Sequence, residues 1–254
     1  SVASLTAQYR MNADIMAISN KLVYSGRLRC GNEEVANLSL RLPEFGKAME
    51  HLHSDPANSC TGDASCWLAQ VLDPAHKALL IDTDATTAME SRTGDLVENP
   101  GEAKIISEIV HAMVSSGVSP HDIAVITPYR QQIKLLTHTL LRRGHPDVEI
   151  LTADKSQGRD KAVVLVSLVR ANPDKTVGRL LGDWRRINVA FTRAQRKLLV
   201  VCSQSTLGGV PIFRDFFELM QERKWIFALP PGAEKSHVDA GESSGRVQRK
   251  LKLA

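Results

Sequence analysis

The sequence lacks features that mark several common classes of protein. Its four cysteines, Cys30, Cys60, Cys66 and Cys202, include no Cys-x-x-Cys pair, and the eight histidines show no spacing typical of metal ligands. We therefore expect no metal site and reduced thiols, with a local Cys60–Cys66 disulfide as the alternative. No apolar run is long enough to span a membrane, and residues 1–10 do not resemble a signal peptide.

The chain also lacks the glycine-rich loop GxxxxGK(S/T) that holds nucleotide phosphates in many ATPases. Leu79–Asp84 (LLIDTD) places acids after apolar residues, as a Mg²⁺-binding Walker B strand does, but no second acid directly follows Asp82. We interpret this segment as an ordinary core strand. The chain by itself is therefore not expected to hydrolyse ATP.

What is present indicates one α/β unit followed by a tail. The 254 residues are 43% hydrophobic, which suffices for one core, and the net charge of +4 is compatible with nucleic acid without pointing to it. We expect residues 1–229 to form the α/β unit, with an insertion at about 47–66 and otherwise irregular structure over 27–76. Residues 230–254 are rich in proline, glycine, serine and charge, which predicts a disordered basic tail.

Short apolar runs alternate with helical patterns, and this alternation predicts a parallel sheet with helices on both faces. The expected strands are 78–81, 123–126, 148–151, 162–169 and 198–202. The expected helices are 12–25, 102–117, 130–143, a helix after Asp183 and 211–224, and residues 83–101 are expected to form a loop.

Two dense polar clusters lie between the last three expected strands. In the first, Gly158 gives the backbone freedom, Gln157 offers both a donor and an acceptor, and Asp160 offers an acceptor for ribose hydroxyls. A plain polar turn is the alternative interpretation. So many polar groups beside buried strands favour an anionic ligand at the ends of the strands.

The second cluster lies on the helix expected after Asp183. Arg186, Arg193 and Lys197 fall on one face with the small Ala190 between them, which leaves room for a phosphate chain. A solvated basic face is the alternative. The opposite, core-facing residues are Trp184, Ile187, Phe191, Ala194 and Leu198.

Two shorter segments are further candidates. Thr127, Pro128 and Tyr129 follow a strand and open a helix, where a hydroxyl and backbone N–H groups can hold a nucleic-acid phosphate. A capped helix start with a packed tyrosine explains them equally well. Tyr9 and Arg10 lie in a turn before the first helix, where the tyrosine could stack on a base and the arginine could bind phosphate.

Taken in order, these segments resemble the second RecA-like lobe of superfamily 1 helicases. The matching stretches are LTAQYRM (5–11), NPGEA (99–103), ITPYRQQ (126–132), TADKSQGRDKAVVLVSLVR (152–170) and WRRINVAFTRAQRKLLVV (184–201). Within this superfamily the amino-acid sequence of these stretches most resembles that of eukaryotic replication helicase–nucleases, which process Okazaki-fragment flaps and resect DNA ends.

The resemblance implies a role for each matching residue. Arg10 and Arg193 would be arginine fingers on ATP, and Thr127, Pro128, Tyr129 and Thr152 would touch the backbone of single-stranded DNA. The remaining nucleotide contacts would come from Tyr9 against the adenine and from Gln157, Gly158, Asp160 and Arg186.

The resemblance also implies partners outside this chain. ATP with Mg²⁺ would be shared with an N-terminal lobe, and a nuclease domain of the full protein would carry the family's iron–sulfur cluster, which the cysteines here do not match. The expected site of action is the nucleus, with the mitochondrion as a second location. Two alternatives remain: a non-catalytic nucleic-acid-binding or regulatory module, and the corresponding lobe of an RNA helicase.

Overall fold

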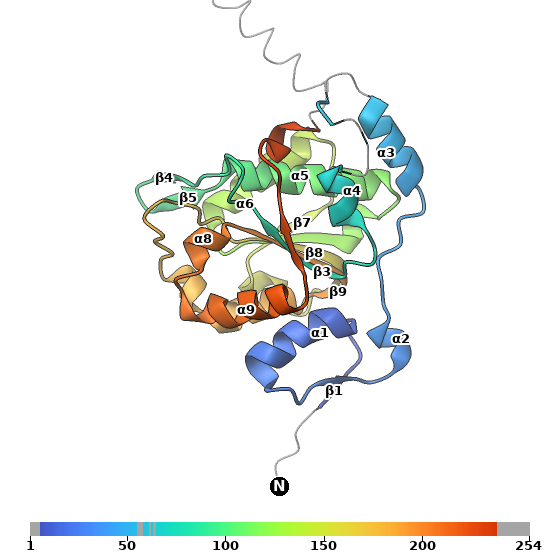
Figure 1. Cartoon of the computed structure of the whole chain (residues 1–254), viewed down its shortest axis with the longest axis vertical. Coiled ribbons are helices and arrows are strands. Elements are labelled where there is room, and N and C mark those ends of the chain that lie inside the picture. Colours follow the sequence, from blue (N-terminus) through green and yellow to red (C-terminus); the bar gives the residue numbers. More distant parts are fainter. Residues whose placement is uncertain (1–5, 55–57, 61, 63–64, 238–254) are drawn as a thin grey trace, which may run out of the picture.

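A six-stranded parallel sheet lies at the centre of the protein (Figure 1). The computed structural model describes residues 6–54, 58–60, 62 and 65–237. The strand order is β10-β3-β9-β8-β6-β7, and every neighbouring pair is parallel, which confirms the predicted α/β class. The strands are β3 (Ala78–Asp82), β6 (Ile123–Ile126), β7 (Glu149–Leu151), β8 (Lys161–Ser167), β9 (Ala194–Cys202) and β10 (Ile226–Ala228).

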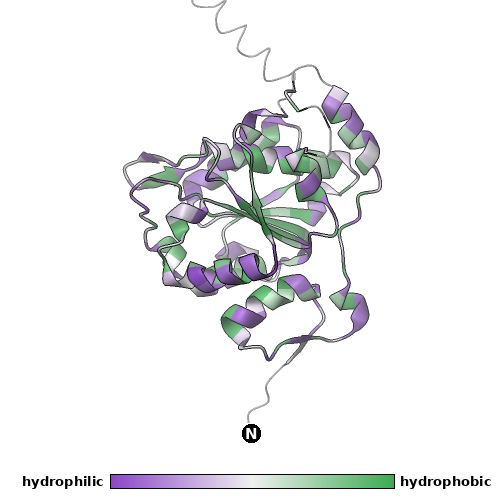
Figure 2. Ribbon diagram, in the orientation of Figure 1, coloured by the Kyte–Doolittle hydropathy of each residue, from purple (hydrophilic) through white to green (hydrophobic). Residues whose placement is uncertain are grey.

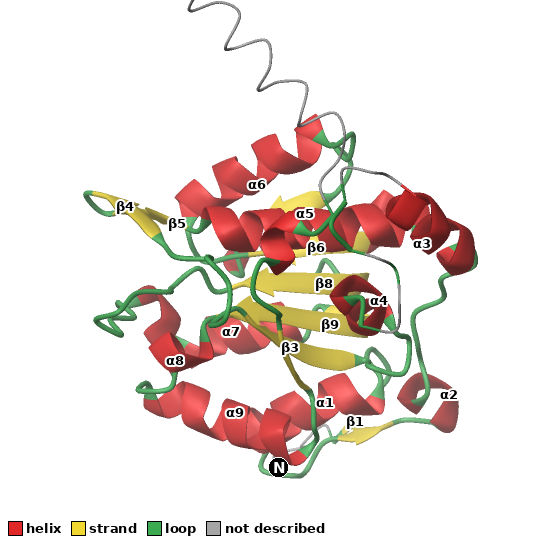
Figure 3. Cartoon of the chain, turned by 45° about the horizontal axis from the view of Figure 1, so that its top comes forward, coloured by secondary structure: helices red, strands yellow, loops and turns green. Residues whose placement is uncertain are grey.

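Helices cover both faces of this sheet (Figure 3). Alternate strand residues point to opposite faces, so Leu165 packs in one apolar cluster and Val164 in the other. Figure 2 shows the central strands as the most apolar part of the fold. One face carries α3 (Phe45–Ser54), α4 (Trp67–Leu72), α5 (Pro100–Ser115) and α6 (Arg130–Arg142), and the other carries α1 (Ala13–Ser19), α7 (Trp184–Phe191), α8 (Gln204–Leu207) and α9 (Pro211–Glu222).

Local sequence signals fix where two of the helices begin. The Asn12 side chain accepts a hydrogen bond from the Ile15 N–H and caps α1, which continues as a π-helical turn, η1 (Asn20–Tyr24). Asn99 caps α5 in the same way through the Glu102 N–H, and Pro100 takes the first helical position. Helix α5 therefore starts at Pro100 rather than at the predicted residue 102.

Regions expected to be irregular contain short regular elements. Residues 27–76 contain β2 (Arg29–Cys30), α2 (Glu33–Ala36), α3 and α4, and β2 pairs in parallel with β1 (Ala7–Gln8). The expected loop at 83–101 contains an antiparallel hairpin, β4 (Ser91–Thr93) and β5 (Leu96–Glu98). The strands were missed because two or three residues show no measurable periodicity. The ten-residue α3 was missed because most of it lies in the stretch 47–66, which was interpreted as an insertion. The single-turn 3₁₀ helices are η2 (Pro120–Asp122), η3 (Asp154–Ser156), η4 (Leu180–Gly182) and η5 (Ala233–Lys235).

The predicted start of the tail is wrong. Residues after 229 continue into η5, and Ala233, Glu234 and His237 are all buried. The Trp67 indole N–H donates to Ser236 Oγ at 2.8 Å, which ties this segment to α4. The rest of the predicted tail, 238–254, lies outside the described residues.

The predicted basic helix row is also wrong at its end. Helix α7 stops at Phe191 and strand β9 begins at Ala194, so Lys197 is a strand residue rather than the last member of a helical row. The chain leaves the helix through Thr192, and neither glycine nor proline marks the change. Phe191, Ala194 and Leu198 do pack in the core, and the Trp184 side chain lies outside the description.

Two expectations about chemical environment concern the whole chain. All four cysteines are free thiols, in agreement with the reduced state expected from the sequence. Among the helices that the structure describes, none has the length and apolar character needed to cross a bilayer.

Candidate functional site

The candidate residues gather at two opposite edges of the sheet. Strands β8 and β9 begin side by side, with Lys161 paired to Ala194, so Asp160 and Arg193 meet at the amino edge. The Lys161 N–H donates to the Arg193 carbonyl at 2.9 Å and fixes this approach. Thr127 and Thr152 follow the carboxyl ends of β6 and β7 and therefore lie at the other edge.

One carboxylate at the amino edge holds both predicted arginine fingers. Arg10 Nε lies 2.8 Å from Asp160 Oδ2, and Arg193 NH1 lies 3.0 Å from Asp160 Oδ1. The three residues are far apart in the sequence, and the structure brings them together as the resemblance implies. Two cations share one anion, so the cluster keeps a net positive charge suited to phosphate.

The two arginines differ in exposure. Arg193 is only 7% exposed, and its Nε also donates to the Val189 carbonyl at 3.1 Å. Burial and repulsion from Arg10 lower the pKa of Arg193, while Asp160 raises it. The Arg10 side chain is 41% exposed and is therefore the more accessible of the two.

Three other predicted nucleotide contacts, Tyr9, Gln157 and Gly158, are exposed to solvent. Tyr9 is 68% exposed, and its ring lies over Gly31, where an added Cβ would clash with it. Gln157 and Gly158 are exposed in the loop before β8, and Gly158 has a φ of 77°. Within the described part of the chain, neither makes a hydrogen bond to the arginine cluster. The loop is accessible to a ligand and not held against the arginines.

A basic hollow of about 620 Å³ lies at the carboxyl edge. Its wall includes the predicted contacts Pro128, Thr152 and Arg186. Arg186 Nε lies 3.3 Å from Asp154 Oδ1, so this arginine belongs with the predicted nucleic-acid contacts rather than with Arg193. Sequence reasoning missed three further cations in the lining, although two of them recur at helical spacing on α6. These are Arg130, Lys134 and Lys155.

Two predicted nucleic-acid contacts are buried below this hollow. Thr127 is 0% exposed and Tyr129 is 7% exposed, so in this conformation their side chains do not reach a ligand. The Tyr129 N–H donates to Thr127 Oγ1 at 3.4 Å, and the Tyr129 hydroxyl donates to the Val177 carbonyl. The two residues shape the start of α6, which was the alternative interpretation of this segment.

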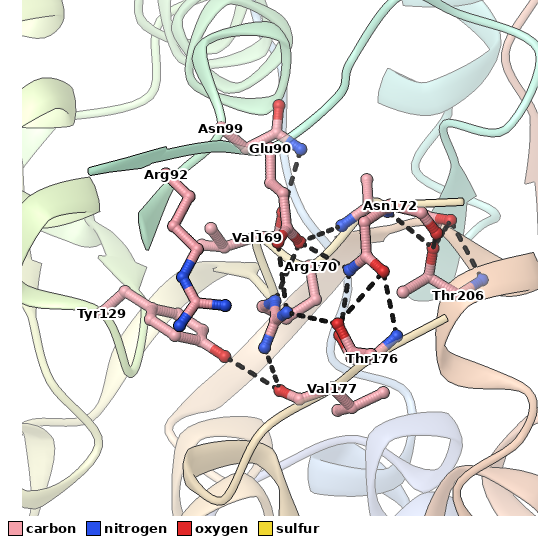
Figure 4. A network of polar contacts seen from close by, with 12 residues as sticks. Glu90, Arg92, Asn99, Tyr129, Val169, Arg170, Asn172, Thr176, Val177 and Thr206 are labelled. Carbon is pink, nitrogen blue, oxygen red and sulfur yellow. Dashed lines mark hydrogen bonds and ion pairs between the residues drawn. The ribbon is translucent and has the colours of Figure 1, made fainter. Parts of the chain in front are cut away.

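A buried ion pair that sequence reasoning missed supports the carboxyl edge (Figure 4). Arg170 follows β8 and donates through Nε and NH2 to Glu90, at 2.8 and 3.1 Å. Asn172 Nδ2 and the Ala171 N–H donate to the same carboxylate. Burial alone would raise the pKa of Glu90, but these hydrogen bonds outweigh it and the pKa is lowered. The pair anchors the loop that leads to Val177, whose carbonyl accepts the hydrogen bond from the Tyr129 hydroxyl.

A second buried acid lies beneath this network. Glu102 Oε2 accepts hydrogen bonds from Ser167 Oγ at 2.6 Å and from the Val169 N–H at 3.0 Å. Complete burial raises the pKa of Glu102 to about 8, against the effect of these hydrogen bonds, so the group is mainly protonated at pH 7. A neutral Glu102 thus joins β8 to α5 without placing a second charge beside Glu90.

Lys197 has an anchoring role as well. Its Nζ is buried and donates to the carbonyls of Asp73 and His76, at 2.8 and 2.7 Å. Burial lowers the pKa of Lys197 to about 7, and Asp73 opposes that shift. The lysine therefore holds the loop before β3 and offers nothing to a ligand.

Comparison with known proteins shows the family of this chain. Residues 1–205 match the family model described as AAA domain, and the chain belongs to this family. The DNA replication ATP-dependent helicase/nuclease DNA2 of Mus musculus is 41% identical over 98% of this chain, which corresponds to 23% of the relative. The DNA2 of Saccharomyces cerevisiae is 41% identical over 90% of this chain and 15% of its own length. The Arabidopsis thaliana protein JHS1, with the same descriptive name, is 42% identical over 91% of this chain and 16% of its own length.

These relatives confirm the resemblance drawn from the motifs. The chain spans less than a quarter of the length of each relative reported above. The helicase and nuclease activities in the names of these longer proteins are therefore properties of those proteins. This chain corresponds to the part of them that contains the sheet and its two edges.

Proposed function

We propose that this chain is the C-terminal motor lobe of an ATP-dependent DNA helicase/nuclease that acts in DNA replication and repair. The observation that carries the proposal is the convergence of Arg10 and Arg193 on Asp160 at one edge of the sheet. Such a cluster can stabilise phosphate charge, yet the sequence has no loop to cradle the rest of a nucleotide. It is half of a nucleotide site, and an N-terminal lobe would supply the other half.

Binding of ATP would redistribute the contacts of this cluster. Arg10 and Arg193 would turn from Asp160 to the γ-phosphate, where a planar, always charged guanidinium stabilises the charge of the transferred group. Asp160 would then be available for the ribose hydroxyls, and the exposed Tyr9 for the adenine. Mg²⁺, which neutralises phosphate charge, would be held by the other lobe, and no residue of this chain is assigned to it.

The basic hollow at the carboxyl edge would hold the backbone of single-stranded DNA. Its lining includes Arg186, three further cations and the half-exposed Pro128 and Thr152, against the single carboxylate of Asp154. Phosphate contacts of this kind give affinity without reading sequence. The loop from η3 to β8 begins beside this hollow at Asp154 and ends at Asp160, so it physically joins the two edges.

The first test concerns ATP hydrolysis in a protein that joins the N-terminal lobe to this chain. Arg193→Ala is expected to lower DNA-stimulated turnover by roughly 10³- to 10⁵-fold with little change in DNA affinity. Arg193→Lys is expected to lose most of the same rate, because lysine keeps the charge but not the fork. Arg159→Ala, which removes an exposed arginine paired with Glu149, is the matched control. Turnover by the 254-residue chain alone that vanishes in Arg193→Ala would contradict the half-site.

The second test concerns nucleic-acid binding by the 254-residue chain. We expect salt-dependent binding of single-stranded DNA that weakens in Arg186→Ala and is unchanged in Arg10→Ala. Matched DNA and RNA strands decide between a DNA and an RNA helicase lobe, because preference for RNA would favour the latter. Binding that ATP does not alter even in the two-lobed protein would favour a non-catalytic module instead.

The wider setting rests on the similarity to the helicase/nucleases alone. We propose a nuclease domain with an iron–sulfur cluster as a partner within the full protein, and the nucleus, with the mitochondrion second, as the location. Imaging of the tagged full-length protein, together with iron analysis of a preparation that contains the nuclease domain, tests both.

A further inference from the structure

Four side chains that can bind a metal meet beside α3 and α4. They are His53 in the last turn of α3, Cys60, Cys66 just before α4, and His237 after η5. One nitrogen or sulfur atom from each lies within 4.8 Å of the corresponding atoms of the other three. Cys60 and Cys66 lie in the expected insertion and His237 lies in the expected tail. The spacing of the four residues in the sequence therefore does not match a common metal-binding motif.

The separations are close to those of a tetrahedral zinc site. Zinc–sulfur bonds of about 2.3 Å and zinc–nitrogen bonds of about 2.05 Å place neighbouring ligand atoms about 3.3 to 3.8 Å apart. Cys66 Sγ lies 3.5 Å from His237 Nε2, which is already the length of a sulfur–nitrogen edge. Side-chain shifts of about 1 Å would bring the widest pair to the same range. Two cysteines and two histidines are a ligand set that selects zinc among common divalent metals.

The hydrogen bonds around His237 leave its Nε2 as the ligand atom. Ser236 Oγ donates its one proton to the Ala233 carbonyl at 2.9 Å and accepts from Trp67 Nε1. Towards His237 Nδ1, which is 3.1 Å away, this oxygen can only accept, so Nδ1 carries the proton. Nε2 then presents its lone pair towards Cys66. Histidines that bind zinc are oriented in this way, by a hydrogen bond from the other ring nitrogen.

His53 and the backbone near Cys60 supply the other half of the arrangement. The Nε2 atom of His53 is buried and has no hydrogen-bond partner within the described part of the chain, which a metal would remedy. The N–H groups of Ser59 and Cys60 donate to the Ser236 carbonyl at 3.2 and 3.3 Å. The loop that bears Cys60 is thus already docked on the segment that bears His237.

We propose that His53, Cys60, Cys66 and His237 bind one structural zinc ion that joins the loop between α3 and α4 to the segment after η5. The sequence of this loop is poor in large apolar residues, so metal binding would supply stability that a hydrophobic core supplies elsewhere. All four positions are taken by protein ligands, which is the arrangement of a structural rather than a catalytic zinc site.

The test uses the 254-residue chain, reduced and freed of metal, with Zn²⁺ and Co²⁺ as probes. We expect one tightly bound zinc per chain, and with Co²⁺ the absorption of a tetrahedral site with sulfur-to-cobalt charge transfer. This measurement needs no variant, so a folding defect does not confound it. Absence of the charge-transfer band overturns the proposal, as does a Cys60–Cys66 disulfide in the isolated protein that takes up no metal after reduction.

Variants then assign the ligands. His53→Gln and Cys66→Ser are expected to weaken Co²⁺ binding by more than about 10-fold, and Ser236→Ala by roughly 10-fold through the orientation of His237. The matched controls are His51→Gln on the exposed side of α3 and Cys30→Ser, which lies outside the group. Equal loss of affinity in the controls and the ligand variants would also overturn the assignment.

Discussion

The two edges of the central sheet hold arginines in opposite situations. At the carboxyl edge, Arg170 is 5% exposed and donates to Glu90, to Thr176 and to the Val177 carbonyl, so its donors are used within the protein. At the amino edge, Arg10 is exposed, and of its side-chain donors only Nε has a partner within the described residues, Asp160. The first arginine holds a loop, and the second has donors left for a ligand.

Arg193 is intermediate between these extremes. It is as buried as Arg170, but the carboxylate it pairs with is shared with Arg10 and is itself 27% exposed. The number of cations at an edge therefore does not identify a binding site. The donors that remain unfilled, and the ease with which a carboxylate can be displaced, are better criteria.

The largest expected effect is on the structural side of the comparison. Arg170→Met leaves the Glu90 carboxylate buried without its cation and should lower the free energy of unfolding by about 3–5 kcal/mol. Urea denaturation measures this. Arg159→Ala breaks the exposed pair with Glu149 and should cost at most about 1 kcal/mol. Equal losses in the two variants would mean that the carboxyl-edge pair is not a distinct anchor.

The second prediction concerns the neutral acid beneath that pair. The pKa of Glu102 is about 8 in the folded protein and about 4.3 in an unfolded chain, so the unfolded state loses its proton first as the pH rises. The stability that the group contributes is complete below the unfolded pKa and is lost as the pH approaches 8. Relative to Glu102→Gln, the wild type should lose about 3 kcal/mol between pH 5 and pH 7.5.

Denaturation curves at several pH values check this dependence. The same substitution at the exposed Glu218 is the control, because that side chain lies on the outer face of α9. A constant stability difference between Glu102→Gln and wild type across this range would show that Glu102 is ionised, and that the edge carries two buried charges instead of one.

The sequence predicted the sheet well because its strands are nearly continuous apolar runs of ordinary length. It failed where one pattern fits two structures. The stretch around Lys197 satisfies both a helical basic row and a buried strand, since no glycine or proline separates α7 from β9. It also failed for β10, which is too short for a period, and for η5, which lies among residues whose composition suggests a tail.

The candidate functional site also contains parts that the sequence predicted and parts that it did not. The Arg10–Asp160–Arg193 cluster was predictable because each residue belongs to a motif and two of them precede neighbouring strands. The Glu90–Arg170 pair was missed because 80 residues separate the partners and Glu90 belongs to no motif, although Arg170 ends the matching stretch 152–170. The sequence left two interpretations open for Thr127 and Tyr129, because a polar residue at a helix start can serve the fold or a ligand. Both side chains are buried in this structure, which favours the role in the fold.

The third prediction tests the corrected role of Lys197. Lys197→Met leaves the carbonyls of Asp73 and His76 without their donor and should lower the free energy of unfolding by about 2 kcal/mol. Lys155→Met, at an exposed position in the hollow, should leave stability nearly unchanged and weaken binding of single-stranded DNA. If Lys197→Met instead left stability intact and weakened DNA binding, the lysine would belong to the ligand site after all.

The smallest expected effect separates the two edges most directly. Asp160→Asn and Asp154→Asn change the net charge equally. The first releases Arg10 and Arg193, whereas the second frees Arg186 from Asp154 and leaves its other ion pair, with Asp183 at 3.4 Å. Both carboxylates are partly exposed. Each ion pair is therefore worth about 0.5–1 kcal/mol, and affinity for an anion at that edge should rise roughly 2- to 5-fold. Asp160→Asn should strengthen binding of inorganic triphosphate, and Asp154→Asn should strengthen binding of single-stranded DNA, as NMR titration can measure. Because a general electrostatic effect would raise both affinities in both variants, only the crossed result supports separate sites for nucleotide and nucleic acid.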